Sequence, residues 1–252
     1  MANNLRKFNT YSDYEAAELV KPAVSLIADT DEVYFDQKAT FNGLTVYYNI
    51  TDTSQPTKLF NVQSGSGSGS GGALPSAMII DGTAVEVTNT YQFSSTGEHI
   101  VQYSIENAFK KLPNAFLDNT TTATKVIIGD YFEKIGYSAF TECSGLTRLN
   151  SDVDGVFNIP DSVTSIGDEA IQNCRKLTTC TIGSGITSIG EFAFFDCKSL
   201  TSVTVNAVTP PTLGDYAFDS TNNDLVIYVP CESVEAYKAA WSRYASRVQP
   251  IP

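Results

Sequence analysis

One pattern of apolar and polar positions occurs three times in the second half of the chain. It reads IGYSAFTECSGLTRL at 135–149, IGDEAIQNCRKLTTCTI at 166–182 and IGEFAFFDCKSLTSVTV at 189–205, with fainter copies LPNAF at 112–116 and LGDYAF at 213–218. Aligned on their alanine, the copies place Ala115, Ala139, Ala170, Ala193 and Ala217 at spacings of 24, 31, 23 and 24 residues. A period in the low twenties with apolar residues at fixed places predicts a solenoid, in which each repeat forms one coil.

Each repeat combines a short strand with a tight turn that share one interior. Leu200, Val203 and Val205 are expected to turn inward, and Phe194 fills the space that the small Ala193 leaves. Because one coil cannot bury its own apolar face, the coils stack about 4.8 Å apart. The predicted core of the three clear repeats comprises Ile135, Ala139, Phe140, Cys143, Leu146, Ile166, Ala170, Cys174, Leu177, Ile189, Ala193, Phe194, Cys197 and Leu200. We expect a solenoid of the leucine-rich kind over residues 107–252.

The 31-residue spacing contains an extra loop, NSDVDGVF, at residues 150–157. Asp152, Asp154 and Gly155 resemble a fragment of a calcium loop, but the distal Glu of a full loop is missing. An exposed turn is the favoured interpretation, and calcium binding stays open. Insertions in solenoids gather on one face, so this loop marks a candidate contact surface.

Residues 37–106 alternate short apolar strands with turns and predict a small all-β, Ig-like sandwich. A run of Gly and Ser at 64–72 interrupts it and indicates a flexible loop or hinge. The run matches a nucleotide-binding glycine pattern, but Pro75 and a strand follow it instead of a helix, which argues against phosphate binding.

Residues 1–36 form a third predicted unit. Ser12 and Glu15 make a capping box for a helix at 13–20, which Pro22 ends, and residues 23–35 read as strand, turn and strand. A piece of this size is too small to stand alone, so it packs on its neighbour, on another copy or on a partner.

The end of the chain, residues 230–252, is predicted to be a cap. Val234, Tyr237, Trp241, Tyr244 and Val248 make one apolar stripe on a helix. A lid over the last coil is favoured over a membrane-seeking helix, because the ends of a solenoid must be covered. The fold class expected is therefore mainly β: a helix–hairpin segment, an Ig-like sandwich, and a capped solenoid.

Charge and composition exclude several classes of partner. The net charge is -12 and no basic patch occurs, so we expect no nucleic acid. No stretch approaches the roughly 20 apolar residues of a membrane span, so we expect no membrane insertion. The first 20 residues lack the apolar core of a secretory signal peptide, so we expect the chain to stay where it is made.

No set of residues predicts a reaction. His99 is the only histidine, and no GxSxG, P-loop or HExxH motif occurs. Cys143, Cys174 and Cys197 occupy the same place in the repeat; a buried column of small apolar side chains is favoured over zinc or disulfides, since no CxxC pair occurs. We therefore expect no cofactor and no catalysis.

The repeats resemble the BspA-like leucine-rich repeats, with the pattern I-G-x-x-A-F-x-x-C-x-x-L-x-x-V. The match is close at 189–203 and good at 166–180 and 135–149, although Ile171 replaces the usual Phe and Cys180 the usual Val. The end, IYVPCESVEAYKAAWSRYASRVQPIP, resembles the usual cap, and residues 78–105 resemble the small β domain that often precedes such repeats in gut Bacteroidales. This resemblance implies surface display and adhesion.

A second, shorter resemblance concerns residues 8–36, FNTYSDYEAAELVKPAVSLIADTDEVYFD. They are similar to the N-terminal segment of structural proteins of phages that infect Bacteroidales, including crAss-like phages. Together the two resemblances imply a virion surface protein, a head fibre or capsid decoration. Its first segment would dock on the capsid or another virion protein, its repeats would bind a host-surface glycan or protein, and a fibre implies a homo-oligomer. The alternatives are a bacterial cell-surface adhesin and an intracellular enzyme or regulator.

Overall fold

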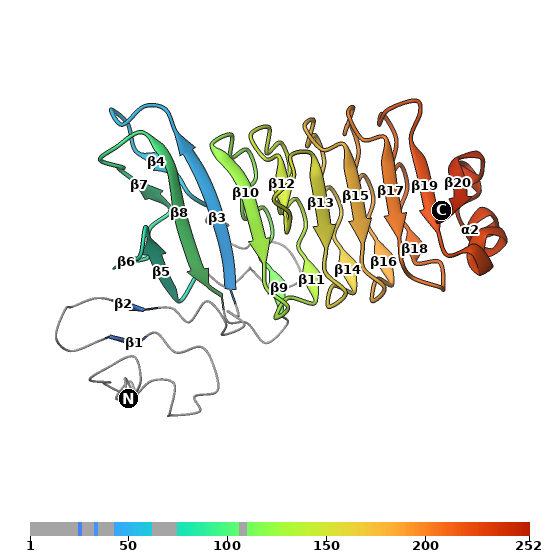
Figure 1. Cartoon of the computed structure of the whole chain (residues 1–252), viewed down its shortest axis with the longest axis horizontal. Coiled ribbons are helices and arrows are strands. Elements are labelled where there is room, and N and C mark those ends of the chain that lie inside the picture. The colour runs from blue at the N-terminus through green and yellow to red at the C-terminus, as the bar shows by residue number, and fades with distance from the viewer. Residues whose placement is uncertain (1–24, 27–32, 35–42, 62–74, 106–109) are drawn as a thin grey trace.

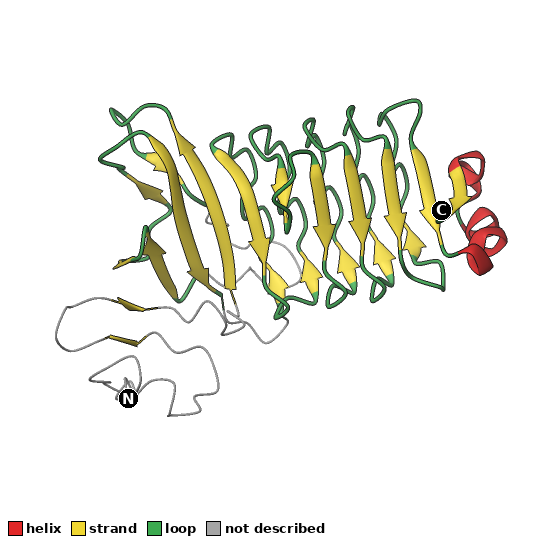
Figure 2. Cartoon of the chain, viewed as in Figure 1, coloured by secondary structure: helices red, strands yellow, loops and turns green. Residues whose placement is uncertain are grey.

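The computed structural model describes residues 25–26, 33–34, 43–61, 75–105 and 110–252. The described chain is an elongated stack of coils with strands standing side by side along its length (Figure 1). Its helices lie at the C-terminal end, beyond the last coil (Figure 2). No helix among the described residues is long and apolar enough to cross a bilayer.

The larger of the two solenoid sheets is parallel throughout the repeats. Neighbouring coils keep one register, so that Cys180 lies opposite Val203 and Ile182 opposite Val205. The strands, in order along the sheet, are β20 (Val248–Pro250), β19 (Val226–Val229), β17 (Ser202–Val205), β15 (Thr179–Ile182), β13 (Val156–Ile159), β12 (Arg148–Leu149) and β10 (Ala123–Ile128).

The smaller sheet is made of two-residue strands, one from each coil. They are β18 (Thr212–Leu213), β16 (Ser188–Ile189), β14 (Ser165–Ile166), β11 (Lys134–Ile135) and β9 (Lys111–Leu112). In each strand the second residue is apolar and packs inward, and the first faces out. The first residues of these strands thus form the solvent-facing row of the small sheet.

The first coil differs by one residue from the alignment that the sequence suggested. Leu112 lies opposite Ile135, which makes Phe116, and not Ala115, the structural equivalent of Ala139. The backbone agrees, because Ala115 has a φ of 50°, as Ser138 does in the next coil. The basic period is therefore 23 residues, and the first coil carries larger side chains where later coils carry Ala.

Two residues per turn have left-handed backbone, and they set the direction in which the coils join. In every turn but the last, their N–H groups donate forward to the next coil, as from Ser138 to the carbonyl of Asp168 at 3.0 Å and from Glu142 to that of Gln172 at 2.9 Å. An uninterrupted helix would spend these donors on its own carbonyls. The pairs are Ala115 and Asn119, Ser138 and Glu142, Glu169 and Asn173, Phe192 and Asp196, and Tyr216 and Ser220.

The N-terminal strands extend the large sheet instead of forming a separate sandwich, so the Ig-like prediction is not supported. Strand β3 (Gly43–Ile50) pairs antiparallel with β10, β8 (Gly97–Ser104) with β3, β5 (Ala77–Ile80) with β8, and β6 (Thr83–Val85) with β5. The short strands β4 (Thr57–Lys58) and β7 (Thr90–Tyr91) pair with each other.

The reason is that these strands share their core with the first coil. The side chains of Tyr48 and Tyr103 are fully buried and lie within hydrogen-bond distance of each other, 2.9 Å between hydroxyls. Phe60 stacks on Phe116 of the first coil with ring centroids 5.4 Å apart. The backbone N–H of Asn61 donates to the carbonyl of Phe116, so this segment covers the open end of the solenoid as a preceding coil would.

In the segment 1–36, the structure describes two short strands, β1 (Ser25–Leu26) and β2 (Val33–Tyr34), which pair antiparallel. The helix predicted at 13–20 and the Gly/Ser run at 64–72 lie outside the described residues.

The predicted C-terminal capping helix is confirmed, but it is shorter than the apolar stripe suggested. A 3₁₀ turn (Cys231–Ser233) leads into α2 (Val234–Ala240), and a second 3₁₀ segment (Ser242–Arg247) leads into β20. The Tyr237 hydroxyl donates to the carbonyl of Ala207 at 2.7 Å, and the Trp241 indole donates to that of Pro211 at 2.9 Å. These aromatic side chains close the last coil.

Candidate functional site

The core residues predicted from the repeats are all buried. Their exposed fractions lie between 0% and 2%, and they belong to one continuous apolar cluster that runs from Leu44 to Val248. They give the coils their shape and leave recognition to the outward-facing side chains.

The three cysteines of the repeat form a column of protonated thiols. Each donates to a carbonyl of the preceding coil: Cys143 to Leu117 at 2.9 Å, Cys174 to Phe140 at 3.3 Å and Cys197 to Ile171 at 3.1 Å. Burial raises the pKa of Cys143 and of Cys197 to about 12 and that of Cys174 well above its usual range. Metal ligation requires thiolates, so this column favours coil-to-coil bonding over metal binding.

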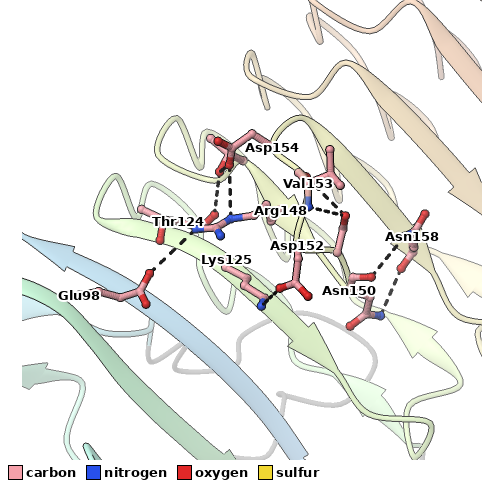
Figure 3. Close-up of polar contacts among 11 residues, drawn as sticks. Glu98, Thr124, Lys125, Arg148, Asn150, Asp152, Val153, Asp154 and Asn158 are labelled. Carbon is pink, nitrogen blue, oxygen red and sulfur yellow. Dashed lines mark hydrogen bonds and ion pairs between the residues drawn. The ribbon is translucent and has the colours of Figure 1, made fainter.

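The inserted loop adds a strand to the large sheet. Leu149 of β12 lies opposite Phe157 of β13, eight positions later in the chain, and both strands belong to the same coil. In Figure 3 the loop lies over the outer face of β10 and its carboxylates turn back onto that face. Asp152 pairs with Lys125 at 2.5 Å, and Asp154 lies 3.4 Å from Arg148.

This loop is fixed by its own polar contacts. The amide groups of Asn150 and Asn158 each donate to the other residue's carbonyl at 3.2 Å. Gly155 has a φ of 80°, and a Cβ there would lie 2.4 Å from the hydroxyl of Thr178, so only glycine fits. Val153, at the loop's tip, is 63% exposed.

The two acidic side chains that suggested calcium are engaged with cations. The Lys125 ammonium lowers the pKa of Asp152 through a hydrogen bond, and Asp154 also accepts a hydrogen bond from Thr147 at 2.9 Å. Among the residues that the structure describes, no three His, Cys, Asp or Glu side chains are grouped to hold a metal ion. The loop is thus held by its own polar contacts, and its carboxylates are neutralised by neighbouring cations.

A groove of about 640 Å³ runs over the small sheet, and we call it the small-sheet groove. Its outward row follows the strand register, because residues opposite each other in β9, β11, β14, β16 and β18 all lie on it. The row reads Lys111, Lys134, Ser165, Ser188 and Thr212. The groove has the volume of an ordinary small-molecule site and is built from five successive coils.

Glycines along one side of the groove let the backbones of neighbouring coils approach each other closely. A Cβ on Gly167 would lie 2.7 Å from the Tyr137 nitrogen, and one on Gly190 would lie 2.5 Å from the Asp168 nitrogen. Such contacts are too close, so the glycine of each I-G pair is a stacking requirement. The sequence motif shows the glycines, but not that they border a groove.

The residue after each glycine forms the groove's wall. Tyr137 is 43% exposed, and Asp168 and Glu191 follow in the next two coils. One oxygen of Asp168 accepts the backbone N–H of Glu191 at 2.8 Å, which fixes that carboxylate on the wall. The groove therefore offers hydroxyl, carboxylate, ammonium and aromatic groups in a row, all of which can contact a polar ligand.

Sequence reasoning missed a polar cluster around His99, between β5 and β8. The ring Nδ1 lies 2.6 Å from Asp81, and Nε2 lies 2.9 Å from the carbonyl of Ser95 and 3.5 Å from its hydroxyl. These are the residue types of a catalytic triad, but Nε2 bonds a carbonyl and must carry a hydrogen. It cannot accept a proton from Ser95, so this arrangement is a structural clasp.

A crystal structure of a leucine-rich repeat protein from Bacteroides ovatus is similar, with 19% identity and a TM-score of 0.28, over 54% of this chain and 50% of that one. The chain therefore spans about half the length of that protein. No curated protein sequence matches it.

The family model described as the BspA-type leucine-rich repeat region matches in six copies, over residues 77–154 and 155–240. These residues include all the coils and the antiparallel strands β5, β6, β7 and β8. The match covers more than half of this chain, so the chain belongs to the BspA-type leucine-rich repeat family.

Proposed function

We propose that this protein is a non-enzymatic recognition protein that binds a host-surface glycan or protein through the small-sheet groove. The observation that carries the proposal is the groove itself, since five coils contribute one outward residue each to a continuous row. A rigid stack holds these groups at fixed spacing before any ligand arrives, which lowers the entropic cost of binding.

Binding without catalysis also fits the most reactive arrangement in the described residues. In the cluster of Ser95, His99 and Asp81, both imidazole nitrogens are already hydrogen-bonded, Nδ1 to Asp81 and Nε2 to the Ser95 carbonyl. The repeat thiols are buried and protonated. Individual contacts in an open groove are weak, so we infer that many displayed copies supply avidity.

A pair of matched substitutions tests the groove. Ser188 lies on the outer row of the small sheet and Ser202 on the outer face of the large sheet, and both are half-buried strand residues. Ser188→Arg should fill the groove and reduce binding to arrayed host-surface glycans and proteins more than tenfold, while Ser202→Arg should leave it unchanged. The reverse result would place recognition on the large sheet.

We further infer display on a phage virion, with residues 1–36 docking on the capsid or on sister copies; a bacterial cell-surface adhesin is the second candidate. The virion role rests on the likeness of residues 8–36 to phage structural proteins, and the adhesin role on the repeats. Immunoelectron microscopy with an antibody against residues 107–252 separates them. Regular labelling of capsids supports the virion role, and labelling of bacterial envelopes alone overturns it.

A further inference from the structure

Two coils enter the small sheet with a Thr-Ser pair whose hydroxyls are used differently. The Thr164 hydroxyl donates to the carbonyl of Glu133 at 3.0 Å, and the Thr187 hydroxyl donates to that of Thr164 at 2.9 Å. These threonines therefore bond each coil to the one before it. The hydroxyls of Ser165 and Ser188 line the small-sheet groove and make no hydrogen bond among the described residues. They are available to a ligand as both donors and acceptors.

The wall of the groove carries acceptors that are only partly used. Oδ1 of Asp168 accepts the backbone N–H of Glu191 at 2.8 Å, while Oδ2 has no partner in the described part of the chain. The Glu191 carboxylate is exposed and makes neither a hydrogen bond nor an ion pair with the residues that the structure describes. An ionised carboxylate can only accept hydrogen bonds, so a ligand that fits this wall must bring donors.

An aromatic side chain occupies the same wall position one coil earlier. Tyr137 is 43% exposed and lines the groove, and its hydroxyl donates to the Glu169 carboxylate at 3.0 Å. This bond fixes the direction of the ring. A fixed and partly exposed aromatic ring can pack against the apolar C–H face of a pyranose, as it packs against other apolar surfaces. Hydroxyls, carboxylates and one aromatic ring together suit a sugar.

The spacing of the coils favours a sugar polymer over a peptide. Ser165 lies opposite Ser188, and Ser188 opposite Thr212, so equivalent groups repeat about every 4.8 Å across the parallel strands. The side chains on one face of an extended peptide repeat about every 6.6 Å, which falls out of step with this row. An extended β-1,4-linked chain of hexopyranoses advances by nearly one strand spacing per sugar. Its successive sugars would therefore meet equivalent groups on successive coils.

The charge of the wall favours a neutral polymer over an anionic one. Asp168 and Glu191 place two negative charges along the hydroxyl row, and the chain as a whole has a net charge of -12. An acidic polysaccharide would bring its own charges against these carboxylates.

We propose that the small-sheet groove binds a neutral, linear β-1,4-linked glycan that lies across the coils. One sugar packs against Tyr137, and the following sugars exchange hydrogen bonds with Ser165 and Ser188 and donate to Asp168 and Glu191. This inference rests on the proposed function and names the ligand class of the same groove.

Calorimetric titration of the full chain with neutral tetrasaccharides tests the proposal. Cellotetraose, mannotetraose and chitotetraose are β-1,4-linked and extended, whereas maltotetraose is α-1,4-linked and curls away from a straight row. At least one of the first three should bind at least tenfold more tightly than maltotetraose. The corresponding disaccharide should bind at least tenfold more weakly than its tetrasaccharide, because it reaches fewer coils.

Two positions in the groove test the contacts with the tetrasaccharide that binds best. Glu191→Gln keeps the size of the side chain but removes its charge, and it should weaken binding about tenfold, as expected for the loss of a charged hydrogen bond. Glu86→Gln, at an exposed glutamate outside the groove, is the control and should change nothing. Tyr137→Phe keeps the ring and should bind as the wild type does, whereas Tyr137→Leu should weaken binding about tenfold. Circular dichroism checks that each variant is folded.

The outcomes separate this inference from the proposed function. Binding of maltotetraose as tight as that of the β-1,4-linked tetrasaccharides would refute the linear glycan, and so would unchanged binding by both Glu191→Gln and Tyr137→Leu. If no tetrasaccharide binds while Ser188→Arg abolishes binding on the arrays, the glycan class is wrong and recognition by the groove stands. If Ser188→Arg leaves binding on the arrays unchanged, the proposed function fails, and this inference fails with it.

Discussion

Two left-handed residues in each turn decide how neighbouring coils bond. Non-glycine residues with positive φ cost about 1–2 kcal/mol each, yet the solenoid repeats them at five turns. The forward hydrogen bonds of their N–H groups explain why the conformation is kept. These positions carry Ser, Glu, Asn, Asp, Ala, Phe and Tyr, so residue type alone does not reveal them.

Glu142 offers a direct check, because it is exposed and has a φ of 56°. Glu142→Gly should raise the free energy of unfolding by about 0.5 kcal/mol, and Glu142→Val should lower it by about 1 kcal/mol, since a β-branched residue tolerates left-handed backbone worst. Both changes remove the same charge, so their difference isolates the backbone. Urea unfolding measures it.

Exposed Ser144, two residues later, lies outside the left-handed positions and is the control. At this position the valine variant should have a free energy of unfolding at least as high as that of the glycine variant. If the difference in the free energy of unfolding between the glycine and valine variants is the same at position 142 as at position 144, the proposed cost of left-handed backbone at the turn is refuted.

Among the elements, the antiparallel strands depend on one clasp that links the β5–β6 turn to β8. Asp81 sits in that turn with a φ of 49° and accepts both the His99 ring N–H and the backbone N–H of Ile100, the latter at 2.8 Å. The His99 ring packs against the Phe93 ring, with the two ring centroids 4.4 Å apart. A buried imidazole therefore holds the edge of the sheet against its neighbour.

The clasp predicts a dependence of stability on pH. Burial lowers the pKa of His99, but hydrogen bonds with Asp81 and Ser95 outweigh it, and the net pKa is raised above the usual 6.5. The protonated ring thus stabilises the fold fully below about pH 6.5, and this stabilisation is lost as the pH rises through the folded-state pKa.

Urea unfolding between pH 5.5 and 8.5 should therefore show the wild type losing stability on alkalinisation. Asp81→Asn should flatten that dependence, and because His99 is the only histidine, no other imidazole obscures it. If Asp81→Asn shows the same change of unfolding free energy with pH as the wild type, the contact between Asp81 and His99 does not cause the pH dependence.

Sequence patterns predicted the solenoid well, because apolar residues at a fixed period have one efficient way to be buried. They failed for β3, β5, β6 and β8, since alternation is the same whether strands form a sandwich or extend another sheet. What decides is the packing of Tyr48, Phe60 and Tyr103 on the first coil, which no local pattern encodes. His99 and Asp81 meet across 18 residues for the same reason.

In the part of the chain that the structure describes, the stack of coils is closed at both ends, by Leu59 and Phe60 at the start and by Tyr237 and Trp241 at the finish. The two sheets give it two different outer faces. The large sheet carries the inserted loop, whose carboxylates pair with neighbouring cations. The small sheet carries the groove, which is lined by lysines, hydroxyl side chains and carboxylates. The claim that recognition belongs to the small sheet is central.

The crystal structure of this protein with the ligand that it binds best on the arrays tests that claim most directly. The account predicts a ligand lying along the small-sheet groove, in contact with Ser165, Ser188 and Thr212. A ligand seated on the large sheet or on the loop around Val153, with the groove empty, would contradict it.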